Sequence, residues 1–147
     1  MIFQKTLEHV LSGEKTQTSR IWRENYLPEY FDGHLLSVRN PRGILLYYIG
    51  QELSVQPNRG MKGIARIRIQ ELHKADVRDF DADDFQREML SDILFYKTWA
   101  SMHDKAHYKT TETHSTNEWI KRLNLRHEER YTALVFIFEL VKESVAA

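Results

Sequence analysis

The chain has 147 residues, 41% of them hydrophobic and 29% charged, which is typical of a single folded domain spanning residues 1–147. No apolar run reaches the ~18 residues of a membrane span, and the first residues lack the pattern of a signal peptide. We therefore expect a soluble, cytoplasmic protein that does not contact a membrane. The absence of cysteine excludes disulfides, cysteine-ligated zinc and a thiolate nucleophile.

The formal charges cancel, with 21 basic and 21 acidic residues, but they are unevenly distributed along the chain. Residues 15–68 hold nine basic and four acidic residues, whereas residues 69–104 hold four basic and nine acidic residues. This separation predicts a basic patch on one face if the two segments stay apart in the fold. The alternative is that these charges interleave on the folded surface.

The first half of the chain alternates short elements with turns. We expect an amphipathic helix over residues 4–12 that ends at Gly13, and then an extended, threonine-rich segment over residues 14–22. Further short strands are expected at residues 35–38, 44–49 and 53–55. Apolar and cationic residues alternate over residues 63–72, which predicts a half-buried antiparallel strand.

The second half predicts helices followed by one buried strand. Asp81 is a candidate N-cap for a helix that continues toward Trp99, with apolar residues recurring at Phe85, Met89 and Ile93. Ser115 and Glu118 fit a capping box at the start of another helix. The unbroken apolar run within residues 131–140 predicts a strand buried on both faces. These elements predict an α+β fold, a small, partly closed and mostly antiparallel β-barrel with short helices packed outside.

One motif resembles a known family. Residues 13–20 read Gly-Glu-Lys-Thr-Gln-Thr-Ser-Arg directly after the first helix, which resembles the G-x-K-T-x-T-x-R signature of ASCH domains in the PUA-like superfamily. Residues 49–55, the alternating strand and the terminal apolar strand resemble later elements of that family. The segments 21–49 and 81–126 are longer than in minimal members, so loops that face a ligand are expected to differ.

The resemblance implies recognition of RNA or of a nucleotide. One branch of the family resembles an amidohydrolase that removes the acetyl group of N4-acetylcytidine by means of a Lys, a Thr and a Glu before a later helix. Carried onto this sequence, these residues are Lys15, Thr18 and, by its spacing before Ser115, Glu112. Glu118 is the other candidate, but the capping box gives it a structural role.

The residue types suit this chemistry. An amide hydrolase needs a nucleophile, a base and a group that stabilises the oxyanion; a partly desolvated Lys15 with a lowered pKa would serve as base for Thr18 or for water. In a regular strand Lys15 and Thr18 face opposite sides, so their convergence requires a turn or bulge, for which Gly13 is well placed. Glu112 would polarise or protonate the leaving amine. Arg20 stays charged and suits a phosphate clamp.

A second set of residues favours nucleic-acid binding. Arg66 and Arg68 share the cationic side of the alternating strand, and with Arg59 and Lys62 they would form a groove that follows a phosphate backbone. Trp22 lies near the basic motif and would stack on an unpaired base. The alternatives are an ordinary solvated strand face and a tryptophan that packs in the core.

We expect neither a metal nor a cofactor. His103 and His107 are spaced four residues apart with His114 nearby, but the acidic residue of a zinc-protease motif is missing. Neither serine hydrolase context nor a phosphate-binding or dinucleotide-binding loop is present.

The preferred hypothesis is a domain that binds RNA or a modified nucleoside in a cleft lined by residues 13–20 and a basic strand face. The alternative is an amidohydrolase of N4-acetylcytidine-type nucleosides that uses Lys15, Thr18 and Glu112. A third possibility is an interaction module without a ligand of its own. The sequence does not specify an oligomeric state.

Overall fold

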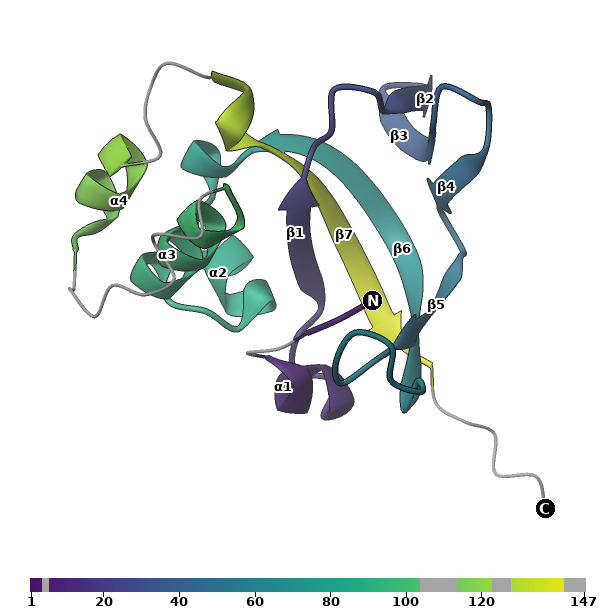
Figure 1. Cartoon of the computed structure of the whole chain (residues 1–147), viewed down its shortest axis with the longest axis horizontal. Helices are drawn as coiled ribbons and strands as arrows, with labels where there is room; N and C mark the ends of the chain where they lie inside the picture. Colours follow the sequence, from purple (N-terminus) through teal and green to yellow (C-terminus); the bar gives the residue numbers. More distant parts are fainter. Residues whose placement is uncertain (4–5, 104–113, 123–127, 142–147) are drawn as a thin grey trace.

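The computed structural model describes residues 1–3, 6–103, 114–122 and 128–141, and Figure 1 shows their arrangement. The helical elements are α1 (Leu7–Leu11), η1 (Val77–Asp79), α2 (Ala82–Glu88), α3 (Asp92–His103), α4 (Thr116–Arg122) and η3 (Glu128–Tyr131), where η marks a short 3-10 helix. The strands are β1 (Gln17–Ile21), β2 (Leu27–Phe31), β3 (His34–Arg39), β4 (Leu45–Tyr48), β5 (Glu52–Val55), β6 (Ala65–Asp76) and β7 (Thr132–Leu140). None of the helices in these ranges is long and apolar enough to cross a membrane.

The strands form one antiparallel sheet in the order β1-β7-β6-β3-β2, with β4 paired to β3 and β5 to β6. The α+β class is confirmed. The barrel prediction was wrong: β1 and β2 are the two ends of this order, and no pairing among the described residues closes them. The sheet stays open at β1 because α2, and not a further strand, packs beside the residues that lead into β1. The Thr16 amide donates to the Arg87 carbonyl at the end of α2.

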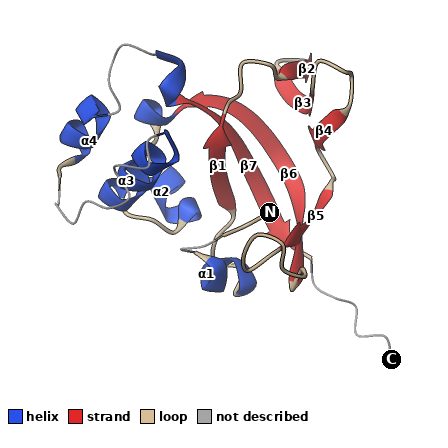
Figure 2. Cartoon of the chain, in the orientation of Figure 1, coloured by secondary structure: helices blue, strands red, loops and turns tan. Residues whose placement is uncertain are grey.

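β7 lies between the two hydrophobic cores of the protein. Leu134, Phe136 and Phe138 pack into the core beneath β3, β5 and β6, whereas Ala133 and Val135 face the core formed with α3 and α4. Because side chains alternate between the faces of a strand, a strand buried on both faces needs an unbroken apolar run. The sequence prediction for this strand is confirmed, and Figure 2 shows α2, α3 and α4 gathered on one side of the sheet, with α1 apart from them.

The helix predicted from Asp81 toward Trp99 is two helices. Asp81 caps α2 as expected and forms a capping box with Asp84. The chain then reverses at Met89, whose φ of +57° is left-handed, before α3 begins. The apolar positions on which the single helix was based continue across this break, so periodicity alone does not detect it. The capping box of Ser115 and Glu118 at α4 is confirmed by both of its hydrogen bonds.

Strand β2 was missed by the sequence analysis. It pairs with β3 through a tight hairpin in which Asp32 and Gly33 both have positive φ. Asp-Gly is a standard sequence for such a turn. The strand itself carries little apolar alternation because most of its side chains are exposed, and this weakens the sequence signal.

Candidate functional site

The site begins at the turn between α1 and β1. Gly13, with φ +82°, ends the helix as predicted, and the Lys15 amide then donates to the His9 carbonyl. Regular pairing of β1 starts at Gln17, so Lys15 precedes the strand and does not obey its alternation. The side chain of Lys15 is therefore directed inward and is only 3% exposed.

The end of α2 supplies the partner of this lysine. Lys15 Nζ donates to the Glu88 backbone carbonyl at 2.6 Å and lies 3.8 Å from Glu88 Oε1. The left-handed Met89 directly after Glu88 ends the helix, which frees the last carbonyl groups for partners outside it. The Thr16 amide takes one of them, that of Arg87. Two consecutive residues of the motif thus bind the last turn of α2.

Glu88 is buried and bound from a second direction. The Ser19 hydroxyl donates to Glu88 Oε2 at 2.9 Å, and Glu88 itself is 2% exposed. Burial raises the pKa of Glu88 and lowers the pKa of Lys15 to about 8, in each case against the attraction of the opposite charge. Desolvation outweighs that attraction, so the base and the acid of this pair are both tuned toward neutral pH.

A small cavity of about 90 Å³ adjoins this pair. Its polar wall comes from Thr18, Ser19, Arg20 and Glu88, and its apolar wall includes Phe3, Leu90, Phe95, Trp99 and Met102. An apolar lining with a few convergent polar groups is the lining of a typical ligand site, but this volume accommodates only a small chemical group.

Two polar groups of the cavity lining are buried without a hydrogen-bond partner. They are Arg20 Nε and Thr98 Oγ1. The Arg20 guanidinium is held in place because its Nη2 donates to the Ile2 carbonyl at 2.8 Å and its Cζ lies 5.4 Å from the centre of the Phe3 ring. Buried polar groups usually have partners, so a donor and a hydroxyl left over at one cavity mark a place for ligand atoms.

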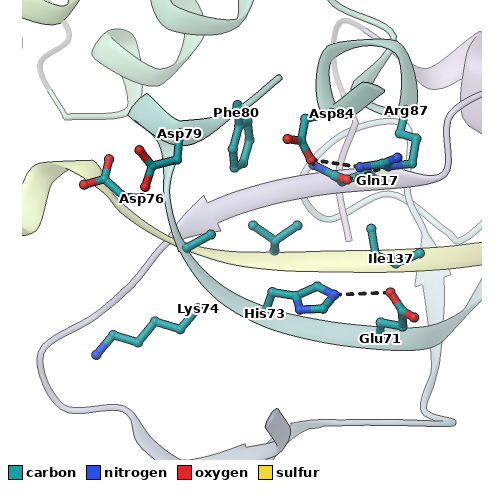
Figure 3. Close-up of a pocket in the computed structure, with 12 residues that line it drawn as sticks. Gln17, Glu71, His73, Lys74, Asp76, Asp79, Phe80, Asp84, Arg87 and Ile137 are labelled. Atoms are coloured by element: carbon teal, nitrogen blue, oxygen red, sulfur yellow. Dashed lines mark hydrogen bonds and ion pairs between the residues drawn. The ribbon is translucent and has the colours of Figure 1, made fainter. Parts of the chain in front are cut away.

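A separate network holds α2 against β1. The buried Gln17 side chain accepts from Arg87 Nε at 2.9 Å and donates to Asp84 Oδ1 at 3.3 Å, while Arg87 also pairs with Asp84. Figure 3 shows these three residues on the rim of a wider hollow of about 580 Å³, across from His73 and Glu71. Because Glu88 follows Arg87 directly, this network fixes the position of the buried carboxylate.

The predicted site residues do not all lie together. Lys15, Thr18 and Arg20 gather at the cavity and at Glu88. Glu112 lies outside the described residues, as does His107. Within the described ranges, no three metal-ligating side chains gather at one point.

The predicted nucleic-acid residues lie elsewhere. Arg68 pairs with Glu52 and Glu139, and Arg66 pairs with Glu52. The exposed Arg59 and Lys62 belong to the turn between β5 and β6, and none of these four basic residues lines the small cavity.

Trp22 is partly buried and packs against the core. Its ring meets the Tyr26 ring edge-on with centres 5.4 Å apart, and Lys74 Nζ lies 4.6 Å from the centre of the Trp22 ring. The core alternative therefore holds for Trp22.

Glu88 is the residue that the sequence analysis missed. It falls between two apolar positions of the supposed single helix, Phe85 and Met89, and looks there like a solvent-facing residue. The spacing from Lys15 is 73 residues, so only the docking of α2 on β1 brings the two together. No local signal in the sequence identifies it.

Comparison with known proteins supports the fold. No protein-family model matches the chain, and no curated protein matches it. A crystal structure of a protein from Enterococcus faecalis V583, described by the family model DUF984, matches with a TM-score of 0.55 and 14% identity over 91% of this chain and 68% of that chain. At this identity the likeness shows a shared fold alone.

A second structure, the ASCH domain from Lactobacillus crispatus JV V101, aligns at a TM-score of 0.48 and 17% identity over 90% of this chain and 68% of that chain. A TM-score below 0.5 carries no argument, so this second match adds nothing to the fold likeness shown by the first structure. The ASCH resemblance therefore continues to depend on residues 13–20.

Proposed function

We propose that the protein is an amidohydrolase of small N-acylated compounds of the N4-acetylcytidine type, with Lys15, Thr18 and Glu88 as its catalytic residues. The observation that carries the proposal is the buried Lys15–Glu88 pair beside a cavity that Thr18 lines. Glu88 takes the role that the resemblance implied for Glu112. Titratable groups whose pKa values are shifted by burial cluster at functional sites, which supports a catalytic role for this pair.

The chemistry follows from these groups. The Thr18 hydroxyl oxygen attacks the amide carbon, and its proton passes to the neutral amine of Lys15, which is substantially populated near pH 8. The protonated Glu88 carboxyl, favoured by its raised pKa, donates a proton to the departing nitrogen as the C–N bond breaks. In the second step water attacks the acyl ester of Thr18 and gives a proton to the Glu88 carboxylate. The protonated Lys15 amine returns a proton to the Thr18 oxygen as the C–O bond breaks, which releases the acid and restores both residues.

The cavity size bears on the substrate. A volume of about 90 Å³ suits a short acyl group rather than a whole nucleoside. A wider hollow of about 380 Å³, lined by Tyr47, Leu53 and Gln56, shares Ile2 and Arg20 with the cavity. In this proposal the acyl group occupies the cavity, the rest of the molecule extends toward that hollow, and Arg20 contacts both parts.

The experiment that tests the proposal is release of cytidine from N4-acetylcytidine, followed by chromatography. Wild type should hydrolyse N4-acetylcytidine. The variants Lys15→Met, Thr18→Val and Glu88→Gln should each lose at least about 100-fold in kcat/KM. Glu52→Gln, which alters an exposed glutamate, is the matched control and should retain full activity. Absence of turnover by folded wild type on N-acetylated and N-propionylated nucleosides would overturn the proposal.

The second candidate is a domain that binds RNA or a modified nucleoside without hydrolysing it. The exposed Arg59 and Lys62, together with Arg66, whose side chain is 69% exposed, favour it. Binding of RNA through these residues would weaken steeply with salt, whereas a nucleoside held across the small cavity and the adjoining hollow would bind almost independently of salt. A salt series with a single-stranded RNA and with the free nucleoside separates the two candidates.

A further inference from the structure

Exposed apolar side chains concentrate at one corner of the molecule, far from the Lys15–Glu88 pair. Eight of the thirteen large exposed hydrophobic residues among the described ranges belong to β2, β3, β4 and their connections. We call them the β2–β4 patch: Leu27, Tyr30, Phe31, Leu36, Ile44, Leu45, Tyr48 and Ile49. Figure 1 shows this corner at the opposite side of the sheet from α2, α3 and α4.

The patch is large for a surface that faces only water. Phe31 alone is 71% exposed. Together the eight residues expose as much surface as just under four fully exposed residues of this size. At about 190 Å² for a fully exposed residue of this size, the patch presents roughly 700 Å². A stable interface buries about 800 Å² on each partner, which is close to the apolar area exposed at this corner.

The strand register brings several of these side chains together on one face. Glu29, Ser37 and Tyr48 lie side by side across β2, β3 and β4. Phe31 lies two residues further along β2, and Leu36 meets Ile49, whose amide donates to the Leu36 carbonyl. Phe31 and Tyr48 therefore lie on the same face of the sheet as Glu29 and Ser37, whereas Tyr30, one residue before Phe31, lies on the other face.

Charge decides between the possible occupants of the patch. Residues 27–49 contain two acidic and two basic residues, a net charge of zero, and Glu29 and Arg39 form an ion pair with each other. A neutral surface of this kind does not attract a phosphate backbone, which requires unpaired basic groups. It also imposes no charge repulsion on a second copy of the same surface.

We infer that the β2–β4 patch is the interface of a homodimer, in which two copies of the chain bury this corner against each other about a twofold axis. A twofold interface uses the same patch on both copies, which a single neutral apolar surface satisfies. β2 pairs only with β3 among the described residues, so its outer edge is open to the partner. Pro28 removes one amide donor from that edge, so side-chain packing carries the contact rather than continuous strand pairing. This inference is independent of the proposed hydrolase activity.

Sedimentation equilibrium of the full chain from 1 to 200 µM tests the inference. Wild type should form a dimer in this range, and Phe31→Glu should weaken dimerisation at least about 30-fold, because it places a charge in the centre of the interface. Leu94→Glu on α3 is the matched control, since Leu94 is 49% exposed but lies outside the patch. It should leave the dimer unchanged.

Circular dichroism and thermal melts confirm that the variants are folded. A wild type that stays monomeric at 200 µM would overturn the inference, as would a dimer that Phe31→Glu leaves intact or that Leu94→Glu dissociates. A monomer that binds single-stranded RNA through Phe31 would likewise overturn it and assign the patch to nucleic acid. A Leu36→Cys variant carrying a spin label gives a second readout in this cysteine-free chain: a short label-to-label distance is expected, and its absence in a dimer contradicts the assignment.

Discussion

Two ion pairs in this protein each join a basic side chain to a glutamate, but one pair, Lys15–Glu88, is buried and the other, Arg68–Glu52, is exposed. The side chains of Lys15 and Glu88 are each 3% exposed, with Nζ and Oε1 3.8 Å apart. Arg68 and its partner Glu52 are 44% and 36% exposed, with a shorter distance of 3.0 Å between nitrogen and oxygen. Despite the shorter contact in the exposed pair, it is Glu88 of the buried pair that lines the small cavity with its unpartnered polar groups.

The pKa values of the two basic side chains, Arg68 and Lys15, shift in opposite directions. The hydrogen bonds that Arg68 donates to Glu52 and Glu139 raise the pKa of Arg68, whereas burial lowers the pKa of Lys15 to about 8. In water the attraction between charges is weak but unopposed, while in the interior the loss of hydration exceeds it. Burial therefore decides which ion pair can take part in acid-base chemistry.

Glu88→Gln should have the largest effect on stability. It leaves Lys15 buried without its carboxylate, which should lower the free energy of unfolding by about 3 kcal/mol at pH 7. Urea unfolding of the variant measures this. Glu52→Gln, at the exposed pair, should show no measurable change, and equal losses in the two variants would contradict the distinction between the two environments.

The pH dependence of stability should differ between wild type and Lys15→Met. Because the folded pKa of Lys15 is about 8 and its model value is 10.5, the unfolded chain binds more protons between these values. Stability of wild type should therefore rise with pH across that window, by about 2 kcal/mol between pH 8 and 10, and Lys15→Met should lack this rise. Urea unfolding at several pH values checks it, and parallel curves for the two proteins would refute it.

Ser19→Ala should have an intermediate effect. The variant removes the buried hydrogen bond to Glu88 Oε2, which should cost about 1.5 kcal/mol and raise the pKa of Glu88 further. The matched control is Ser12→Ala, which removes an exposed hydrogen bond from a serine hydroxyl to Glu14 Oε1. Thermal melts of both variants provide the measurement. A loss in Ser12→Ala as large as in Ser19→Ala would show that burial is not the cause.

Met89→Gly should be slightly stabilising. Met89 adopts a left-handed φ of +57° directly after Glu88, and glycine adopts that conformation without the steric cost of a β-carbon. We expect a gain of about 0.5 kcal/mol in urea unfolding, with hydrolysis unchanged. A loss of stability would show that packing of the methionine side chain outweighs the backbone strain.

Arg68→Gln should have the smallest effect. Its partners Glu52 and Glu139 stay hydrated when the guanidinium is removed, because they are 36% and 44% exposed. The melting temperature should match that of wild type at both low and high salt. A large drop that salt does not reduce would show that the exposed network is structurally required.

Local patterns predicted several elements correctly. Gly13 ends the first helix, Asp81 and Ser115 cap helices, and the apolar run in residues 132–140 forms the doubly buried strand. Each of these signals depends on residues within one or two turns of one another. The barrel failed as a prediction because closure of a sheet depends on which elements reach its edges, and no local pattern encodes that.

The candidate site shows the same division. The sequence by itself determined that Lys15, Thr18 and Arg20 belong to one motif and that no thiol takes part in the chemistry. Only the tertiary structure decided that Lys15 is buried, that Glu88 is its partner and that Arg66 and Arg68 pair with glutamates away from the cavity. The reason is physical: a pKa depends on the loss of water around a group, and here that loss arises when α2 docks on β1 across 73 residues of chain.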